Sequence, residues 1–239
     1  MSAWKHTGRT DKHYFDWVFT PGNEDAAEAF RQHMQFKNSL GKAWFENQEL
    51  FNHVFGGDAF IDAPASGEKP VVLIDVGGSD GYILKQCHLA HPRMAQTGRL
   101  ILQDLPGQID SLDKASLIPI EAMPYDLFTP QPVREARAYY LKMVLHDWPD
   151  EQCKEMLVNL RSAMKPGYSK ILINDIVIPE TGAGWFEVAV DLVMMWIHSA
   201  QERRERAWRS MIESVEGLKV TKIWNIEGAS EKVIEVDAV

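Results

Sequence analysis

The chain has 239 residues, of which 45% are hydrophobic and 25% are charged, and its formal net charge is −9 at pH 7. This composition predicts one domain with a sizeable core and a small appendage, and it excludes a disordered chain. The negative charge argues against nucleic acid and against an anionic membrane surface as partners, because both bind basic protein surfaces.

Cysteine usage and the apolar segments indicate a reducing compartment. The two cysteines, Cys87 and Cys153, do not make a disulfide framework, which fits the cytoplasm. The N-terminus lacks the apolar stretch of a signal peptide. Residues 185–198 form the most apolar helical stretch, but they are too few to span a bilayer and include Glu187 and Asp191. We therefore expect them to form a buried helix and expect no membrane segment.

Residues 1–60 are typical of a helical N-terminal segment. Pro21 and Gly22 break the chain, and Asn23 is a suitable N-cap for a helix with acidic residues in its first turn. Residues 56–70 have the composition of a linker. The sequence therefore predicts a first segment at 1–60 and a second domain at 61–239.

From residue 71, strand-like runs alternate with amphipathic helical segments such as 82–92 and 150–164. This alternation predicts an α/β fold, in which a parallel sheet has helices on both faces. Two later runs have no helix between them, and they predict an antiparallel hairpin at one edge of the sheet. The strand-like runs are 71–76, 100–104, a weak run at 117–122, 138–145, 170–175, 218–226 and 231–237.

Polar residues and glycines follow these strands, where parallel sheets bind ligands. They are Asp75, Gly77 and Gly78 after the first strand, Asp104 after the second, Asp126 beyond the third, His146 after the fourth and Asp175 at the end of the fifth. One such group for each strand, all on one rim, predicts a binding site there.

The glycine turn at 77–81 does not have the spacing of a nicotinamide-binding turn, and no phosphate-binding Lys-Ser/Thr pair follows it. By itself the turn is also compatible with a tight strand-to-helix connection that binds nothing. Asp104 favours a ligand, because a carboxylate at the end of the next strand can bind both hydroxyls of a ribose. A carboxylate without a cation for phosphate favours an adenosyl ligand that lacks a pyrophosphate.

Several stretches together carry a resemblance to a known family. They are "DVGGSDG", "LILQDLPGQI", "MPYDLFTPQPVREARAYYLKMVLHDWPDEQC", "ILINDIVIPE", "DLVMM" and "ER", in this order. The chain resembles the S-adenosylmethionine-dependent O-methyltransferases of the fungal and plant caffeic-acid type over residues 71–239, and more loosely over 15–60. The resemblance implies a class I, Rossmann-like methyltransferase domain with a mostly parallel seven-stranded sheet, preceded by a short helical segment.

The resemblance also implies roles for individual residues. The residues expected at S-adenosylmethionine are Gly77, Gly78, Asp104, Leu105, Asp126, Leu127 and Lys142. His146 matches the general base, and Asp175 and Glu202 match the two carboxylates beside it. Those expected at the acceptor are Met143, Met194, Met195 and His198.

Simpler readings exist for several of these residues. His146 could cap the following helix, Glu202 could be a first-turn acid, and the methionines could fill the core. Cys87, His88 and His91 suggest a metal, but without a second cluster a solvated helix face fits better, and we expect no metal.

The resemblance implies O-methylation of a phenolic or enolic small molecule of secondary metabolism as the expected function, with S-adenosylmethionine as the cofactor. The resemblance implies that full-length relatives carry an N-terminal domain that dimerises and closes the acceptor pocket, and we expect most of it to be missing here. The alternative is therefore a methyltransferase-like protein that binds the cofactor or a partner without methylating, and a nicotinamide oxidoreductase is a distant third. We also expect a homodimer or a partner protein to cover residues 15–60.

Overall fold

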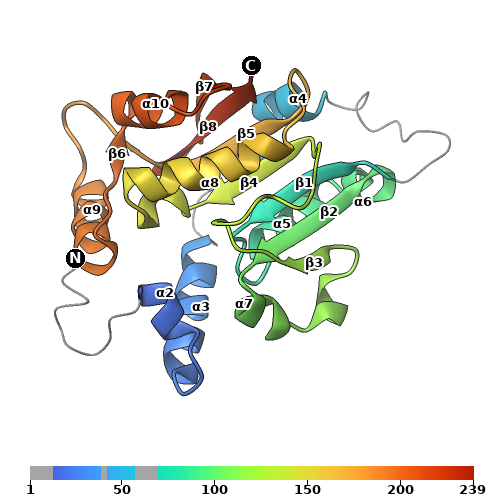
Figure 1. The fold of residues 1–239 in the computed structure, drawn as a ribbon, viewed down its shortest axis with the longest axis horizontal. Coiled ribbons are helices and arrows are strands. Elements are labelled where there is room, and N and C mark those ends of the chain that lie inside the picture. Colours follow the sequence, from blue (N-terminus) through green and yellow to red (C-terminus); the bar gives the residue numbers. More distant parts are fainter. Residues whose placement is uncertain (1–12, 39–41, 57–68) are drawn as a thin grey trace.

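The computed structural model describes residues 13–38, 42–56 and 69–239. Its main feature is one sheet with the strand order β3-β2-β1-β4-β5-β8-β7 (Figure 1). Strands β1 to β5 run parallel, whereas β8 is antiparallel to both of its neighbours. The strands are β1 (Val71–Val76), β2 (Arg99–Asp104), β3 (Glu121–Pro124), β4 (Ala138–Lys142), β5 (Lys170–Ile178), β7 (Leu218–Asn225) and β8 (Glu231–Ala238). This is the mostly parallel sheet with an antiparallel edge hairpin that the sequence predicts.

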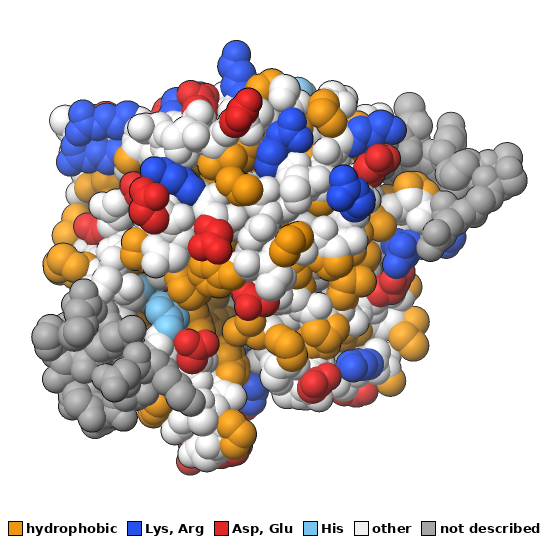
Figure 2. All heavy atoms as spheres, viewed as in Figure 1, with side chains coloured by type: hydrophobic (Ala, Val, Ile, Leu, Met, Phe, Trp, Pro, Cys, Tyr) orange, Lys and Arg blue, Asp and Glu red, His pale blue; other side chains and the backbone are white. Residues whose placement is uncertain are grey.

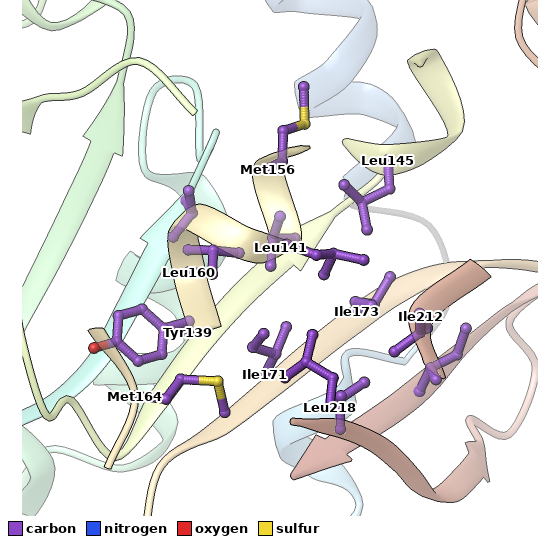
Figure 3. Packing of buried hydrophobic residues seen from close by; sticks show 14 of the residues in the cluster. Tyr139, Leu141, Leu145, Met156, Leu160, Met164, Ile171, Ile173, Ile212 and Leu218 are labelled. Carbon is purple, nitrogen blue, oxygen red and sulfur yellow. The ribbon is translucent and has the colours of Figure 1, made fainter. Parts of the chain in front are cut away.

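Helices cover both faces of the sheet, because the strand residues are apolar on both sides (Figure 1). One core lies between the sheet and helices α8 (Asp150–Ala163) and α10 (Glu205–Glu213). Figure 3 shows side chains of β4 and β5, such as Leu141 and Ile173, pointing toward Met156 and Leu160 of α8. The opposite core lies beneath α4 (Gln48–Phe55), α5 (Tyr82–Ala90) and α6 (Arg93–Thr97).

Helix α4 packs against the sheet, although it belongs to the predicted N-terminal segment. The Asn47 side chain caps the helix by accepting from the Leu50 N–H, and the left-handed Gly56 ends it. Its apolar side chains are buried in the second core, and the His53 ring lies 3.0 Å from the Glu235 carboxylate of β8. Much of the apolar surface of residues 44–55 is therefore covered by the chain's own sheet. A domain boundary at residue 60 stays a prediction, since 57–68 lie outside the described residues.

Three strands differ from the expected bounds by more than one residue. The weak run at 117–122 becomes a 3₁₀ turn (η3, Lys114–Leu117) followed by β3, because Asp113 caps the turn. Strand β4 stops at Lys142, since Met143 has a φ of +52° and a second 3₁₀ turn (η4, Leu145–Asp147) follows. Strand β5 continues past Asp175, because it pairs with β8 and with the short strand β6 (Arg203–Arg204).

The expectation of a buried helix at 185–198 is wrong. These residues do form a helix, α9 (Trp185–His198), but Trp185, Leu192 and Trp196 are more than half exposed, and only Met194 and His198 are buried. The helix lies at the edge of the domain rather than within a core layer (Figure 1). None of the described helices is long and apolar enough to cross a membrane.

Candidate active site

A cavity of about 850 Å³ lies where the parallel strands end. Residues that follow β1, β2, β3 and β4 form its floor, and α9 and the N-terminal helices α2 (Tyr14–Val18) and α3 (Glu24–Asn38) form its walls. Figure 2 shows hydrophobic side chains around a hollow in the lower half of this face. The rim predicted from the strand ends is therefore one face of a large, mostly apolar cavity.

The glycine turn at the end of β1 has no room for side chains. Gly77 has a φ of +74°, and a Cβ on it would come within 2.9 Å of the Val144 side chain. A Cβ on Gly78 would lie 2.5 Å from the Cγ of Asp75. Gly77 lines the cavity, whereas Gly78 packs against Asp75 beneath it. The turn thus brings bare backbone to the cavity wall.

Two carboxyl groups lie next to this turn. The Asp104 carboxylate accepts hydrogen bonds from the backbone N–H of Ser79 at 2.7 Å and of Leu105 at 2.8 Å. Burial nevertheless raises the pKa of Asp104 to about 6, because the charged form loses its hydration. Burial, with the nearby Asp104 charge, raises the pKa of Asp75 to about 7. A ligand that donates hydrogen bonds to a carboxylate would therefore bind favourably at the cavity floor.

The other residues expected at the cofactor also reach the cavity. Leu105, Asp126, Leu127 and Lys142 all line it. Asp126 accepts from the backbone N–H of Phe128 at 3.0 Å, which fixes its carboxylate. The structure thus gathers six of the seven expected cofactor residues at one cavity, with Gly78 immediately below.

His146 sits at the far side of the cavity floor and is 5% exposed. Its Nδ1 atom lies 2.6 Å from Oε1 of Glu202, and Asp175 is farther away, with Oδ1 4.0 Å from the same nitrogen. Both carboxylates lie behind the ring and do not line the cavity. A carboxylate on Nδ1 holds the imidazole in the tautomer that has its lone pair on Nε2.

On the Nε2 side, Asp147 adds a contact that the sequence reasoning missed. Its Oδ1 atom lies 3.5 Å from Nε2 of His146 and 3.4 Å from Nε2 of His198. Burial, together with the nearby His13 and His146, lowers the pKa of His198 to about 3, so that its ring is neutral at pH 7. Asp147 directly follows His146 in the sequence, and this adjacency was the available signal.

The aromatic wall was the second feature that sequence reasoning did not anticipate. The rings of Tyr14 and Phe15 in α2 lie 5.4 Å and 5.2 Å from the His198 ring, and His13 stacks on Trp148 at 4.3 Å. The aromatic residues clustered near position 15 were the signal, but nothing in the sequence says which surface they cover.

The four residues expected at the acceptor do not all reach the cavity. Met143, Met194 and His198 line it. Met195 is 59% exposed and is not among the lining residues, because it points away on the outer side of α9.

Comparison with known proteins identifies the family. The O-methyltransferase domain family matches residues 65–217. The chain is 37% identical over 226 residues to methyltransferase cfoC of Aspergillus candidus, covering 95% of this chain and 53% of that one. It is 43% identical over 185 residues to O-methyltransferase ATR12 of Stachybotrys chlorohalonatus, covering 75% and 46%. The chain therefore spans about half the length of these curated relatives.

Solved structures show the same fold. The complex of LepI with S-adenosylmethionine superposes with a TM-score of 0.83 and 28% identity, covering all of this chain and 58% of that one. OxaC bound to S-adenosylhomocysteine and oxaline gives a TM-score of 0.65 at 34% identity, covering 70% of this chain and 42% of OxaC. The fold is thus the Rossmann-like methyltransferase fold, and the chain belongs to the O-methyltransferase domain family.

Proposed function

We propose that this protein transfers a methyl group from S-adenosylmethionine to a hydroxyl group of a phenolic or enolic small molecule of fungal secondary metabolism. One observation carries the proposal: the cavity joins a bare glycine turn and a ribose-type carboxylate to a histidine whose Nδ1 is held by Glu202 at 2.6 Å. The fungal O-methyltransferase relatives support it.

The residues present fit the cofactor. A cavity of about 850 Å³ has room for it together with a small aromatic acceptor. Gly77 lets the methionine portion approach the backbone, since a side chain there would collide with Val144. Asp104 has a second lone pair on each oxygen for the ribose hydroxyls, and hydrogen bonds to a carboxylate are roughly twice as strong as neutral ones. Asp126 and Leu127 would contact the adenine.

His146 then prepares the acceptor. S-adenosylmethionine supplies a sulfonium methyl group, which is transferred by in-line displacement. A phenol has a pKa near 10, so its oxygen is mostly protonated at neutral pH. His146 takes the phenolic proton on Nε2 as the new oxygen–carbon bond forms, while Glu202 on Nδ1 stabilises the imidazolium. General-base help of this kind contributes roughly 10² to 10⁴ in rate.

Label transfer from methyl-labelled S-adenosylmethionine to a panel of polycyclic phenols tests this function. The wild-type chain should methylate at least one of them. His146→Gln should lower kcat on that acceptor by about 10² or more and leave S-adenosylhomocysteine affinity within about twofold, because the ring acts on the acceptor. Equal rates for wild type and His146→Gln would remove His146 from its role as base.

A second candidate function is cofactor binding without methyl transfer. It is favoured by one comparison: a structure described as a pericyclic reaction enzyme covers the whole chain with a TM-score of 0.78 and 29% identity. Under this alternative the protein binds S-adenosylhomocysteine in calorimetry, but no panel compound becomes labelled. The two functions are separated by running both measurements on the same preparation.

We further propose that a second copy of this chain covers the apolar outer surface of α9. Leu192, Met195 and Trp196 are each more than half exposed, and none of them lines the cavity. Isolated exposed apolar residues are ordinary, but several on one helix mark an interaction surface. Light scattering of the purified chain, with Trp196→Glu as the variant that should shift the protein toward the monomer, tests this part of the proposal.

A further inference from the structure

Glu202 is held in place through its backbone by helix α9. The chain leaves this helix at Ser199, whose φ of +58° reverses its direction. The reversed segment returns alongside the helix, and the N–H of Glu202 donates a hydrogen bond to Oδ1 of Asp191 at 2.8 Å. Asp191 thus fixes the point from which the Glu202 side chain reaches His146.

The next residue, Arg203, holds the loop that carries His146. Its side chain is 1% exposed and donates to the carbonyl oxygens of Leu145 at 3.1 Å and Trp148 at 2.7 Å. These two carbonyls lie immediately before and two residues after His146. The guanidinium also donates to Asp150 at 2.9 Å and stacks over the Trp208 ring at 5.0 Å. Such a rigid, planar set of donors has no equivalent in lysine.

The contacts of Asp191 and Arg203 both act on the contact between Glu202 and His146. Glu202 and Arg203 are adjacent in the chain, so one residue contacts the base and its neighbour carries the base's loop. Building on the proposed function, we propose that Arg203 and Asp191 are positioning residues that set the 2.6 Å contact between His146 and Glu202. Neither side chain lines the cavity, so neither touches the acceptor or the cofactor.

A purely structural role for Arg203 would give a different result. In that case its replacement would destabilise the fold and lower activity whatever residue stands at position 202. In a positioning role, its effect passes through Glu202 and disappears when that carboxylate is removed. A double-mutant cycle measures this difference directly.

The kinetic experiment compares Arg203→Lys in the wild type and in Glu202→Gln, with an acceptor that the wild type methylates. We expect Arg203→Lys to lower kcat about ten- to a hundredfold in the wild type, the size typical of a misplaced catalytic group. In Glu202→Gln it should change kcat by less than about twofold. Equal factors in both backgrounds would overturn the proposal.

The pH profile gives a second readout. Glu202 stabilises the imidazolium form of His146, so loosening their contact removes part of that stabilisation. The acid limb of the kcat profile should therefore move to lower pH in Arg203→Lys, in the direction of Glu202→Gln. An acid limb that stays in place would count against positioning.

Proton NMR of histidine-labelled protein tests the contact without methyl transfer. The proton in the short hydrogen bond between Nδ1 of His146 and Glu202 should give a downfield signal. The loss of this signal in His146→Gln assigns it. The signal should disappear in Arg203→Lys and Asp191→Leu and remain in Asp191→Asn, which keeps the acceptor oxygen. Asp191→Leu also serves if Arg203→Lys does not fold. A signal that is unchanged in both Arg203→Lys and Asp191→Leu would overturn the proposal. This test does not depend on methyl transfer, so it remains valid if no phenol is methylated and the proposed function fails.

Arg204→Lys is the matched control. Arg204 is the next residue of the same short strand, and its ion pair with Glu180 at 3.5 Å lies on the surface. The Arg204→Lys variant should keep the wild-type kcat, the wild-type position of the acid limb and the downfield signal.

Discussion

Gly78 lies directly against the carboxyl group of Asp75, with only 2.5 Å between a Cβ built on Gly78 and the Asp75 Cγ. We expect Gly78→Ala to push Asp75 and the Gly77 backbone apart, since overpacking of a buried site typically costs about 1–3 kcal/mol. S-adenosylhomocysteine should bind at least about tenfold more weakly, and thermal unfolding should occur at a lower temperature. Gly107→Ala is the control, because nothing lies within 4 Å of its Cβ position. Wild-type affinity in Gly78→Ala would show that the turn does not approach the cofactor.

Asp75 should make the protein less stable as the pH rises. Its folded-state pKa of about 7 is above the value near 3.9 of an unfolded chain, so the folded state holds the proton more tightly. The contribution of Asp75 to the free energy of unfolding is therefore complete below about pH 4 and is lost as the pH rises through about 7. Asp75→Asn should raise the free energy of unfolding at pH 8, by at most about 4 kcal/mol, and change it little at pH 4. Chemical denaturation at both pH values measures this, with the exposed Asp110→Asn expected to show no such difference.

Cofactor affinity should depend on the protonation of Asp104. Its pKa of about 6 in the free protein means that ribose hydroxyls meet a carboxylate above pH 6 and a carboxylic acid below it. S-adenosylhomocysteine affinity should therefore fall below pH 6, by up to about tenfold for each pH unit. Asp104→Asn should bind about ten- to a hundredfold more weakly at pH 8, from the loss of charged hydrogen bonds, and should show a flatter pH dependence. Titration calorimetry measures these affinities. Asp126→Asn should weaken S-adenosylhomocysteine binding less than Asp104→Asn does. The opposite ranking would show that Asp104 does not bind the ribose.

The aromatic wall of α2 should govern the acceptor and not the cofactor. Tyr14 and Phe15 contact His198, whose ring lies near the same Asp147 carboxylate as the ring of His146. Replacing both by alanine should raise the KM for an aromatic acceptor about tenfold or more, because each ring buries apolar surface against it. S-adenosylhomocysteine affinity should stay within about twofold. Leu89→Ala, an exposed change outside the cavity, is the control; an unchanged acceptor KM in the double variant would exclude this wall from acceptor binding.

The sequence predicted the sheet well because its strands are buried on both faces and read as uninterrupted apolar runs. Val71–Val76 is the clearest case, and the glycine turn follows it where expected. The extent of β5 was underestimated, since pairing with β6 and β8 depends on residues far along the chain. The weak run near Leu117 failed because local capping by Asp113 favours a turn there.

The candidate site was predicted only in part, for a similar physical reason. Residues at strand ends meet because parallel strands end on one rim, so Asp104 and His146 could be placed together from the sequence. Arg203 lies in a run of charged residues, a pattern typical of exposed positions, yet it is 1% exposed. Its burial depends on carbonyl groups of a distant loop, and no local pattern records them.

The position of β8 has a consequence for how the protein is made. Among the described strands, β8 (residues 231–238) comes last in the sequence, but it lies between β5 and β7 in the sheet. During synthesis on the ribosome, β5 therefore keeps an open edge until these residues emerge, and β7 has no sheet to join. Completion of the sheet therefore waits for residues 231–238, and until they emerge the nascent chain carries an unpaired apolar strand edge of the kind that favours aggregation.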